Sequence, residues 1–322
     1  MRFVAIEDSQ INLTSVTNTG ETDNSLDLKH SKDGITWTQY DFNPIPLAVG
    51  ETLYLKGNNE NGFTDMILGR LCTFGDLSLL GIPSTPSTGK FECHGNIMSL
   101  LFGDDFEDKT TIPSEKCFFF QFCCCDGLLT APELPATTLA NSCYQYMFSG
   151  CTSLTTVPSI LPATTLAEEC YTGMFEGCTS LTTAPELPAT TLPGSCYNSM
   201  FKGCTSLTTA PELPATTLPG SCYNSMFKGC TSLTTAPELP ATTLVGSCYS
   251  YMFNGCTSLN HITMLATDIS PETYANECMY TWVEGVASNG IFVKHPDMHT
   301  IENSPSGIPV GWTVIDYDFK TD

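Results

Sequence analysis

The sequence predicts an α+β protein in which an N-terminal β-sandwich-like module is followed by a short repeat solenoid and a β-containing C-terminal cap. Three observations lead to this prediction. A unit of about 26 residues recurs in the middle of the chain, and Cys178–Gly203 is repeated without substitution as Cys204–Gly229. Each unit has a strand-like half and a helix-like half. Residues 1–101 contain no repeat, but they hold several short apolar runs separated by turn residues.

Residues 1–101 are predicted to form a β-rich anchoring module. The apolar runs Phe3–Ile6, Ile35–Tyr40 and Thr52–Lys56 are typical of short strands. Asp33-Gly34, directly before ITWTQY, is a strong hairpin signal. The NNENG stretch at residues 58–62 is predicted to be a loop.

Two sets of cysteines mark the repeat, and most steps within a set are 26 residues long. Alignment on them gives five full units at residues 125–255, with a half unit, CFFFQFCC, before them and a degenerate unit after them. We therefore predict an N-terminal cap over residues 102–124, a solenoid over 125–277 and a C-terminal cap over 278–322. The sets are Cys125, Cys151, Cys178, Cys204, Cys230 and Cys256, and Cys117, Cys143, Cys170, Cys196, Cys222, Cys248 and Cys278.

Each unit is predicted to fold as strand, turn and helix. Leu181–Ala184 suits an extended segment, and Pro185 and Pro188 prevent a helix from starting directly after it. From Ser195 the apolar residues follow an i, i+1, i+4, i+5, i+8 pattern that is typical of one helical face. One unit cannot bury enough apolar surface to fold alone, so the units are predicted to stack into a right-handed solenoid with one parallel strand per coil.

The helix-like half of each unit runs into the motif G-C-T-S-L. The stretches MFEGCTSL at Met174–Leu181 and MFKGCTSL at Met200–Leu207 resemble the BspA-like (bacterial surface antigen type) leucine-rich repeat. The resemblance covers Cys117 to about Leu259 and implies a leucine-rich-repeat solenoid. Two features depart from the family pattern: the Pro-Glu-Leu-Pro-Ala-Thr-Thr segment, and Met-Phe where Ala-Phe is more usual. Phrases in the flanks, such as GIPVGWTV, more loosely resemble proteins of gut anaerobes and their phages.

The chain has 17 cysteines, which in a secreted protein suggest a disulfide framework. The periodic spacing of the two cysteine sets instead makes each of their members a structural position of the repeat. Free, buried thiols are therefore favoured over disulfides. The run Cys123-Cys124-Cys125 invites a zinc site, but the alignment assigns only Cys125 to a repeating position. No metal ligand and no cofactor is predicted.

The remaining motifs do not favour catalysis. Neither a P-loop nor an H-E-x-x-H or G-x-S-x-G motif occurs, so no catalytic residue is predicted and the chain is not expected to be an enzyme. His295 and His299 are close in sequence, and a solvated loop is favoured over a metal site there. The acidic run at residues 104–108 lacks the spacing of a calcium-binding EF-hand, which favours a charged cap.

The chain is strongly acidic, with 34 acidic and 12 basic residues and a net charge of −22. Such a charge is repelled by phosphate backbones, so nucleic acid is not a predicted partner. No apolar run is long enough to span a bilayer, and membrane insertion is not predicted. The first residues, MRFVAIEDSQINLTSV, have neither the apolar core nor the cleavage site of a secretion signal.

The exposed side chains of the repeat are the candidate binding residues. Threonine pairs should form rows along the strand face, where regularly spaced hydroxyls suit contact with a glycan or a protein edge. Ordinary decoration of an exposed strand by threonine explains the same rows. Two tyrosines at variable, solvent-facing positions also suit a contact surface. The candidates are Thr182, Thr183, Thr208, Thr209, Thr234, Thr235, Tyr146 and Tyr251.

These features favour a non-enzymatic adhesion or structural protein. The N-terminal module is expected to join a larger virion or envelope assembly, and the solenoid to be displayed for attachment to a host surface glycan or protein. The phage-like phrases and the missing signal favour a virion component, such as a fibre or capsid decoration, at the virion or extracellular surface. A bacterial cell-surface adhesin and a carbohydrate-binding module are the alternatives. A homo-oligomer is compatible with the sequence, which does not fix the oligomeric state.

Overall fold

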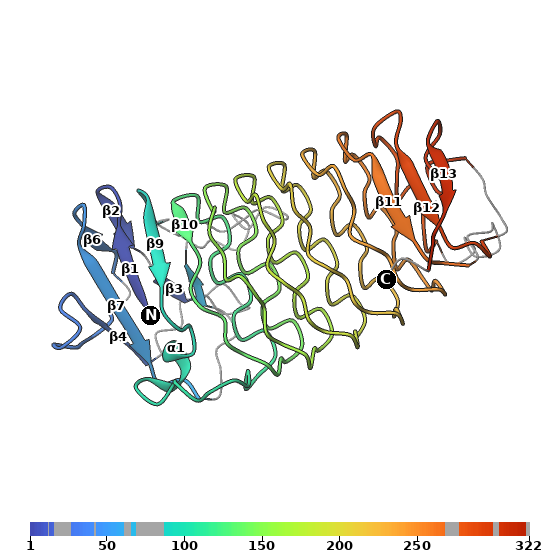
Figure 1. Cartoon of the computed structure of the whole chain (residues 1–322). Helices are drawn as coiled ribbons and strands as arrows, with labels where there is room; N and C mark the ends of the chain where they lie inside the picture. The colour runs from blue at the N-terminus through green and yellow to red at the C-terminus, as the bar shows by residue number, and fades with distance from the viewer. Residues whose placement is uncertain are drawn as a thin grey trace, which may run out of the picture.

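In the computed structural model, coils are stacked between an N-terminal β module and a C-terminal three-stranded sheet (Figure 1). The structure describes residues 1–11, 13–15, 27–41, 43–60, 66–68, 87–267, 277–298 and 303–319. Among them the one helix is α1 (Ser99–Phe102). The strands are β1 (Arg2–Ala5), β2 (Ser9–Ile11), β3 (Leu13–Ser15), β4 (Leu28–Ser31), β5 (Thr38–Gln39), β6 (Ile45–Leu47), β7 (Thr52–Gly57), β8 (Met66–Leu68), β9 (Phe91–His94), β10 (Leu128–Thr130), β11 (His261–Met264), β12 (Ile291–Lys294) and β13 (Thr313–Asp316).

The N-terminal module is built on a six-stranded sheet in the order β10-β9-β1-β7-β4-β5. The predicted hairpin is confirmed, because β4 and β5 pair antiparallel. In the connecting turn the Asp33 carboxylate accepts hydrogen bonds from the N–H groups of Ile35 and Thr36. In the described part of the module, β2 pairs with β6 and β3 pairs with β8, each in a separate two-stranded sheet. The packing of two sheets face to face as a sandwich stays a prediction. Of the predicted loop, residues 61 and 62 lie outside the described residues.

The sheet of the module continues directly into the solenoid. Strand β9 of the module pairs in parallel with β10 of the first coil. At the other end, β11, β12 and β13 form a parallel sheet in which His261, Ile291 and Thr313 share one register. In the coils between, the predicted strand is reduced to single parallel bridges, such as the one between Thr183 and Thr209. The coils are therefore parallel, as predicted.

The predicted helices are wrong, and the α+β layout is not found. The half of the unit that begins at Ser195 forms a ribbon of successive turns. Every second N–H bonds within its coil, as from Cys204 to the Phe201 carbonyl at 3.0 Å. The alternate N–H groups bond the next coil, as from Phe201 to the Met226 carbonyl at 2.9 Å. A helix would use all these N–H groups for bonds within its own segment. The ribbon instead uses half of them to bond the next coil, which stabilises the stack.

The turn ribbon has a period of four residues. Every fourth residue has a left-handed backbone, with φ of 54° at Ser195, 55° at Ser199 and 74° at Gly203. Glycine adopts this conformation without a steric penalty, whereas serine does not. The apolar pattern i, i+1, i+4, i+5, i+8 follows this period of four, and over nine residues it cannot be distinguished from a helical period of 3.6.

Two aromatic columns form the core of the coils. In one, Tyr197 stacks on Tyr223 with ring centres 5.9 Å apart and planes within 3°. In the other, Phe201 stacks on Phe227 at 5.7 Å and 7°. Such pairs contribute about 0.5–1.5 kcal/mol each beyond the burial of their area. The columns are Phe118, Tyr144, Tyr171, Tyr197, Tyr223 and Tyr249, and Phe122, Phe148, Phe175, Phe201, Phe227, Phe253 and Trp282.

The buried cysteines also connect the coils. The thiol of Cys204 donates a hydrogen bond to the Phe175 carbonyl of the preceding coil at 3.1 Å, and Cys230 does the same to Phe201. The same contact recurs at Cys151, Cys178 and Cys256. The structure pairs none of the described cysteines in a disulfide. The repeated cysteine thus supplies a weak donor that links successive coils through the Phe carbonyl.

The buried Tyr223 hydroxyl has no hydrogen-bond partner among the residues that the structure describes, which gives a first prediction. Tyr223→Phe is expected to leave the free energy of unfolding unchanged or to raise it by up to about 1 kcal/mol, because only an unpaired polar group is lost. Tyr223→Ala leaves a cavity in the column and should cost about 3–5 kcal/mol. Urea unfolding of both variants measures this. A loss above about 1 kcal/mol for Tyr223→Phe would show that the hydroxyl is bonded.

Candidate functional site

The predicted threonines lie exposed where consecutive coils are bridged. At Thr208 the first hydroxyl of the pair is used within the protein, because its Oγ1 donates to the Thr182 carbonyl at 3.2 Å. The second hydroxyl of the pair, at Thr183 and Thr209, is bonded to no residue that the structure describes. These hydroxyls are available to a ligand. All six threonines are exposed: Thr182, Thr183, Thr208, Thr209, Thr234 and Thr235.

A groove with a volume of about 920 Å³ lies beside the threonines. It is lined by side chains from the segments 155–159, 182–188 and 209–214, which are equivalent parts of three consecutive coils. Its lining includes the half-buried side chains of Val157, Ala184 and Ala210. Because equivalent segments follow one another, the groove runs along the axis of the stack.

The lining of the groove combines two kinds of polar group. Along each coil a threonine precedes the small apolar residue, and an acidic or polar residue follows it. The lining therefore carries the Thr183 and Thr209 hydroxyls and the exposed carboxylates of Glu186 and Glu212. The part of the lining that the structure describes contains no Lys, Arg or His. The groove thus offers hydroxyls, carboxylate acceptors and small apolar side chains.

The structure brings only some of the predicted binding residues together. Thr182, Thr183 and Thr209 line the groove, whereas Thr208, Thr234 and Thr235 lie outside it. The sequence interpretation missed Glu186 and Glu212. The recurring Pro-Glu-Leu-Pro segment, which departs from the family pattern, is the sequence signal for these two glutamates.

The two predicted tyrosines are far apart in the stack and pack on neighbouring coils. The Tyr146 ring stacks on Phe120 with centres 5.1 Å apart, and burial raises its pKa. Tyr251 meets Tyr280 edge to face at 5.3 Å, and Lys228 Nζ lies 4.5 Å from its ring centre. Both rings are half-buried and lie outside the groove. They extend the stacking of the coils and do not form one surface with the threonines.

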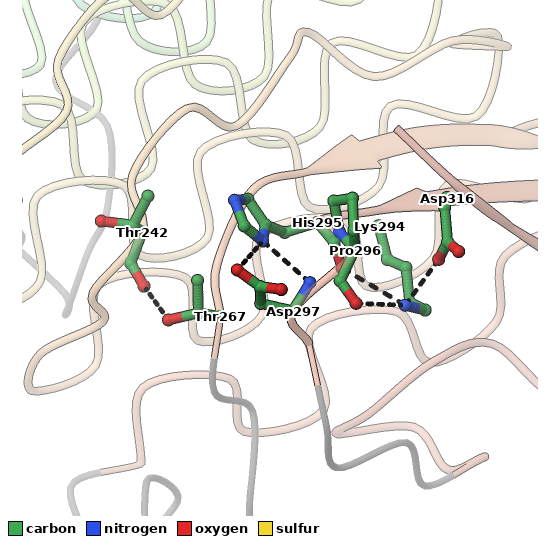
Figure 2. Close-up of polar contacts among 7 residues, drawn as sticks. All are labelled: Thr242, Thr267, Lys294, His295, Pro296, Asp297 and Asp316. Atoms are coloured by element: carbon green, nitrogen blue, oxygen red, sulfur yellow. Dashed lines mark hydrogen bonds and ion pairs between the residues drawn. The ribbon is translucent and has the colours of Figure 1, made fainter. Parts of the chain in front are cut away.

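The predicted loop near His295 is held by local polar contacts (Figure 2). The Asp297 N–H donates to His295 Nδ1 at 3.1 Å, and Lys294 Nζ lies 2.6 Å from the Asp316 carboxylate. Nearby, Thr267 Oγ1 donates to the Thr242 carbonyl at 3.3 Å, another link between coils. His299 lies outside the described residues. Within the described ranges, no group of three or more His, Cys, Asp or Glu side chains is arranged to hold a metal ion.

The thiols are poor nucleophiles at neutral pH. Burial raises the pKa of Cys170 and of Cys256 to about 12, and it raises the pKa of Cys151 in the same direction. Only the thiolate is reactive, so these positions serve packing and hydrogen bonding. None of the helices that the structure describes is long and apolar enough to cross a membrane.

Comparison with known families gives a match to a repeat family. The model of the BspA type leucine-rich repeat region, which describes six copies of the repeat, matches residues 119–211 and also residues 168–282. The two matches overlap and together span half of the chain. No curated protein and no solved structure matches the sequence.

Proposed function

Because the chain belongs to the BspA-type leucine-rich repeat family, we propose that it attaches a larger particle to a host surface through its repeat solenoid. The family membership confirms the resemblance found in the sequence. Proteins of this family are generally non-enzymatic and typically surface-associated, which suggests a role of the adhesion type. The groove along the coils is the contact surface in this proposal.

One observation carries the proposal. Three consecutive coils contribute equivalent segments to one groove, and two of them present the same threonine hydroxyl, alanine methyl group and carboxylate. A catalytic centre needs a single constellation of unlike groups, whereas a repeated surface gains affinity from many weak, equivalent contacts. The two identical units, Cys178–Gly203 and Cys204–Gly229, fit the second arrangement.

The particle is proposed to be a phage virion, in which the N-terminal module anchors the protein as a fibre or capsid decoration. The pairing of β9 with β10 supports this role, because it joins the module to the first coil within one sheet. A bacterial cell-surface adhesin is the second candidate, and the groove supports it equally. Detection of the protein in purified virions would favour the first candidate, and detection only in a bacterial envelope would contradict it.

Binding to intact cells tests attachment itself. The fluorescently labelled full chain should bind the surface of at least one strain in a panel of intestinal anaerobes, and an excess of unlabelled chain should displace it. A panel without displaceable binding would contradict attachment to a bacterial host.

A further inference from the structure

We infer that the groove binds an unbranched, uncharged polysaccharide that lies along the stack, with one sugar unit on each coil. The inference rests on the proposed function, because it names the ligand class of the same surface. It follows from the spacing, the charge and the hydrogen-bonding groups of the groove.

The spacing of the coils suits a chain of sugar rings. Consecutive coils are joined by parallel backbone hydrogen bonds, such as that from the Thr208 N–H to the Thr182 carbonyl at 3.0 Å. Neighbouring chains joined in this way lie about 4.8 Å apart, which is close to the length of one pyranose unit. An extended peptide advances about 3.4 Å per residue and alternates its side chains. Its successive residues would therefore not meet equivalent groups on successive coils.

The groups of each coil suit a sugar ring. The Thr183 hydroxyl can donate and accept, and the Glu186 carboxylate accepts from sugar hydroxyls. The methyl group of Ala184, which also lines the groove, offers an apolar contact to the face of the ring. The next coil repeats this set with Thr209, Ala210 and Glu212, which are the same positions of an identical unit. The two coils form equivalent subsites, so a ligand gains similar contacts from each.

The charge of the groove excludes acidic polysaccharides. The charged side chains of the described lining are the carboxylates Glu186 and Glu212. The whole chain adds a net charge of −22, so uronic acid or phosphate groups would be repelled at the groove and on approach. A neutral glycan has no such penalty. Its binding should change little when the salt concentration is raised about tenfold.

Pretreatment of the cells that the chain binds distinguishes the ligand classes. Mild periodate, which cleaves the vicinal diols of sugars, is expected to lower binding at least about tenfold, and protease treatment should leave it unchanged. Loss of binding after protease but not after periodate would overturn the polysaccharide inference and leave attachment intact. A panel with no binding before treatment would overturn attachment itself, and the inference with it.

Groove variants test where the polysaccharide binds. Thr183→Val with Thr209→Val keeps the side-chain shape and removes two unbonded hydroxyls, so affinity for polysaccharide released from the bound cells should fall about tenfold. The matched control is Thr190→Val with Thr216→Val, which changes exposed threonines of the same coils outside the groove and should bind as wild type. Both variants should keep the wild-type Tm. Equal affinities for the two variants would overturn the assignment to the groove.

Length-graded fragments of that polysaccharide test the subsites. Affinity should rise with each added unit until the coils of the groove are filled and then level off. An affinity that is independent of length, or binding of acidic fragments alone, would overturn the inference.

Discussion

Raising the pH above about 9 is expected to unfold the protein in one cooperative transition, while the fold persists at neutral pH. The cause is the number of buried thiols. An exposed thiol has a pKa of 9.0, whereas burial raises the pKa of Cys125, Cys170 and Cys256 to about 12. Between these values the unfolded chain loses protons that the folded chain keeps. Stability is therefore fully present below pH 9 and falls as the pH rises toward 12.

The expected effect is large. Each thiol that ionises only on unfolding lowers the free energy of unfolding by about 1.4 kcal/mol per pH unit. Ten such thiols would remove about 14 kcal/mol within one unit, which is as much as a typical domain has. The buried tyrosine column adds to the effect at higher pH, because burial raises the pKa of Tyr144 and Tyr171 well above 10.0.

Circular dichroism and thiolate absorbance, followed together against pH under reducing conditions, measure this transition. Both signals should change at the same pH. The slope of the unfolding free energy against pH gives the number of protons released on unfolding. In the double variant Cys204→Ala with Cys230→Ala, this number should be lower by two. Thiolate absorbance that appears before the fold is lost would show that the thiols ionise in the native stack, contrary to the account.

Removal of one whole coil should be tolerated, whereas removal of half a coil should abolish folding. Deletion of Cys178–Gly203 places Cys204 directly after Gly177 and restores the same sequence at the junction. The Gly177 N–H, which bonds the Lys202 carbonyl at 2.7 Å, would then meet the equivalent carbonyl of Lys228. Because each coil contacts only its neighbours, the shortened stack should remain folded with a modestly lower Tm.

A deletion of Cys178–Thr190 is the matched control. It sets the Pro-rich segment of one coil against the turn ribbon of the next, so the aromatic columns and the bonds between coils are lost together. Circular dichroism and thermal unfolding of the two deletions separate the outcomes. If both variants fold, or if both fail to fold, the result would contradict the claim that whole coils are interchangeable units.

The stacking of the coils could be predicted from the sequence, but their local backbone conformation could not. The cysteine columns gave the coil boundaries, because stacking needs the same small side chain at the same place in each coil. The apolar pattern from Cys196 to Cys204 is too short to separate a helix from a four-residue turn period. Gly203 signals a left-handed residue, but Ser199 and Tyr251, with φ of 55° and 56°, give no such signal. Their conformation is imposed by bonds to the next coil.

The candidate site was predictable only in part. Exposure of the threonine pairs followed from their place in the repeat. Which hydroxyl of a pair is used internally depends on the carbonyl of the preceding coil, as with Thr208 and Thr182. The groove depends on how the chain turns between Thr183 and Glu186, and no residue pattern specifies that turn.

A length series tests the stacking account most directly. One, two and three further copies of Cys178–Gly203, inserted after Gly229, should each lengthen the molecule by about 4.8 Å. The maximum dimension measured by small-angle X-ray scattering should therefore rise in equal steps, with an unchanged circular dichroism spectrum per residue. Steps of unequal size, or a molecule whose length does not depend on the number of copies, would contradict a stack of equivalent coils.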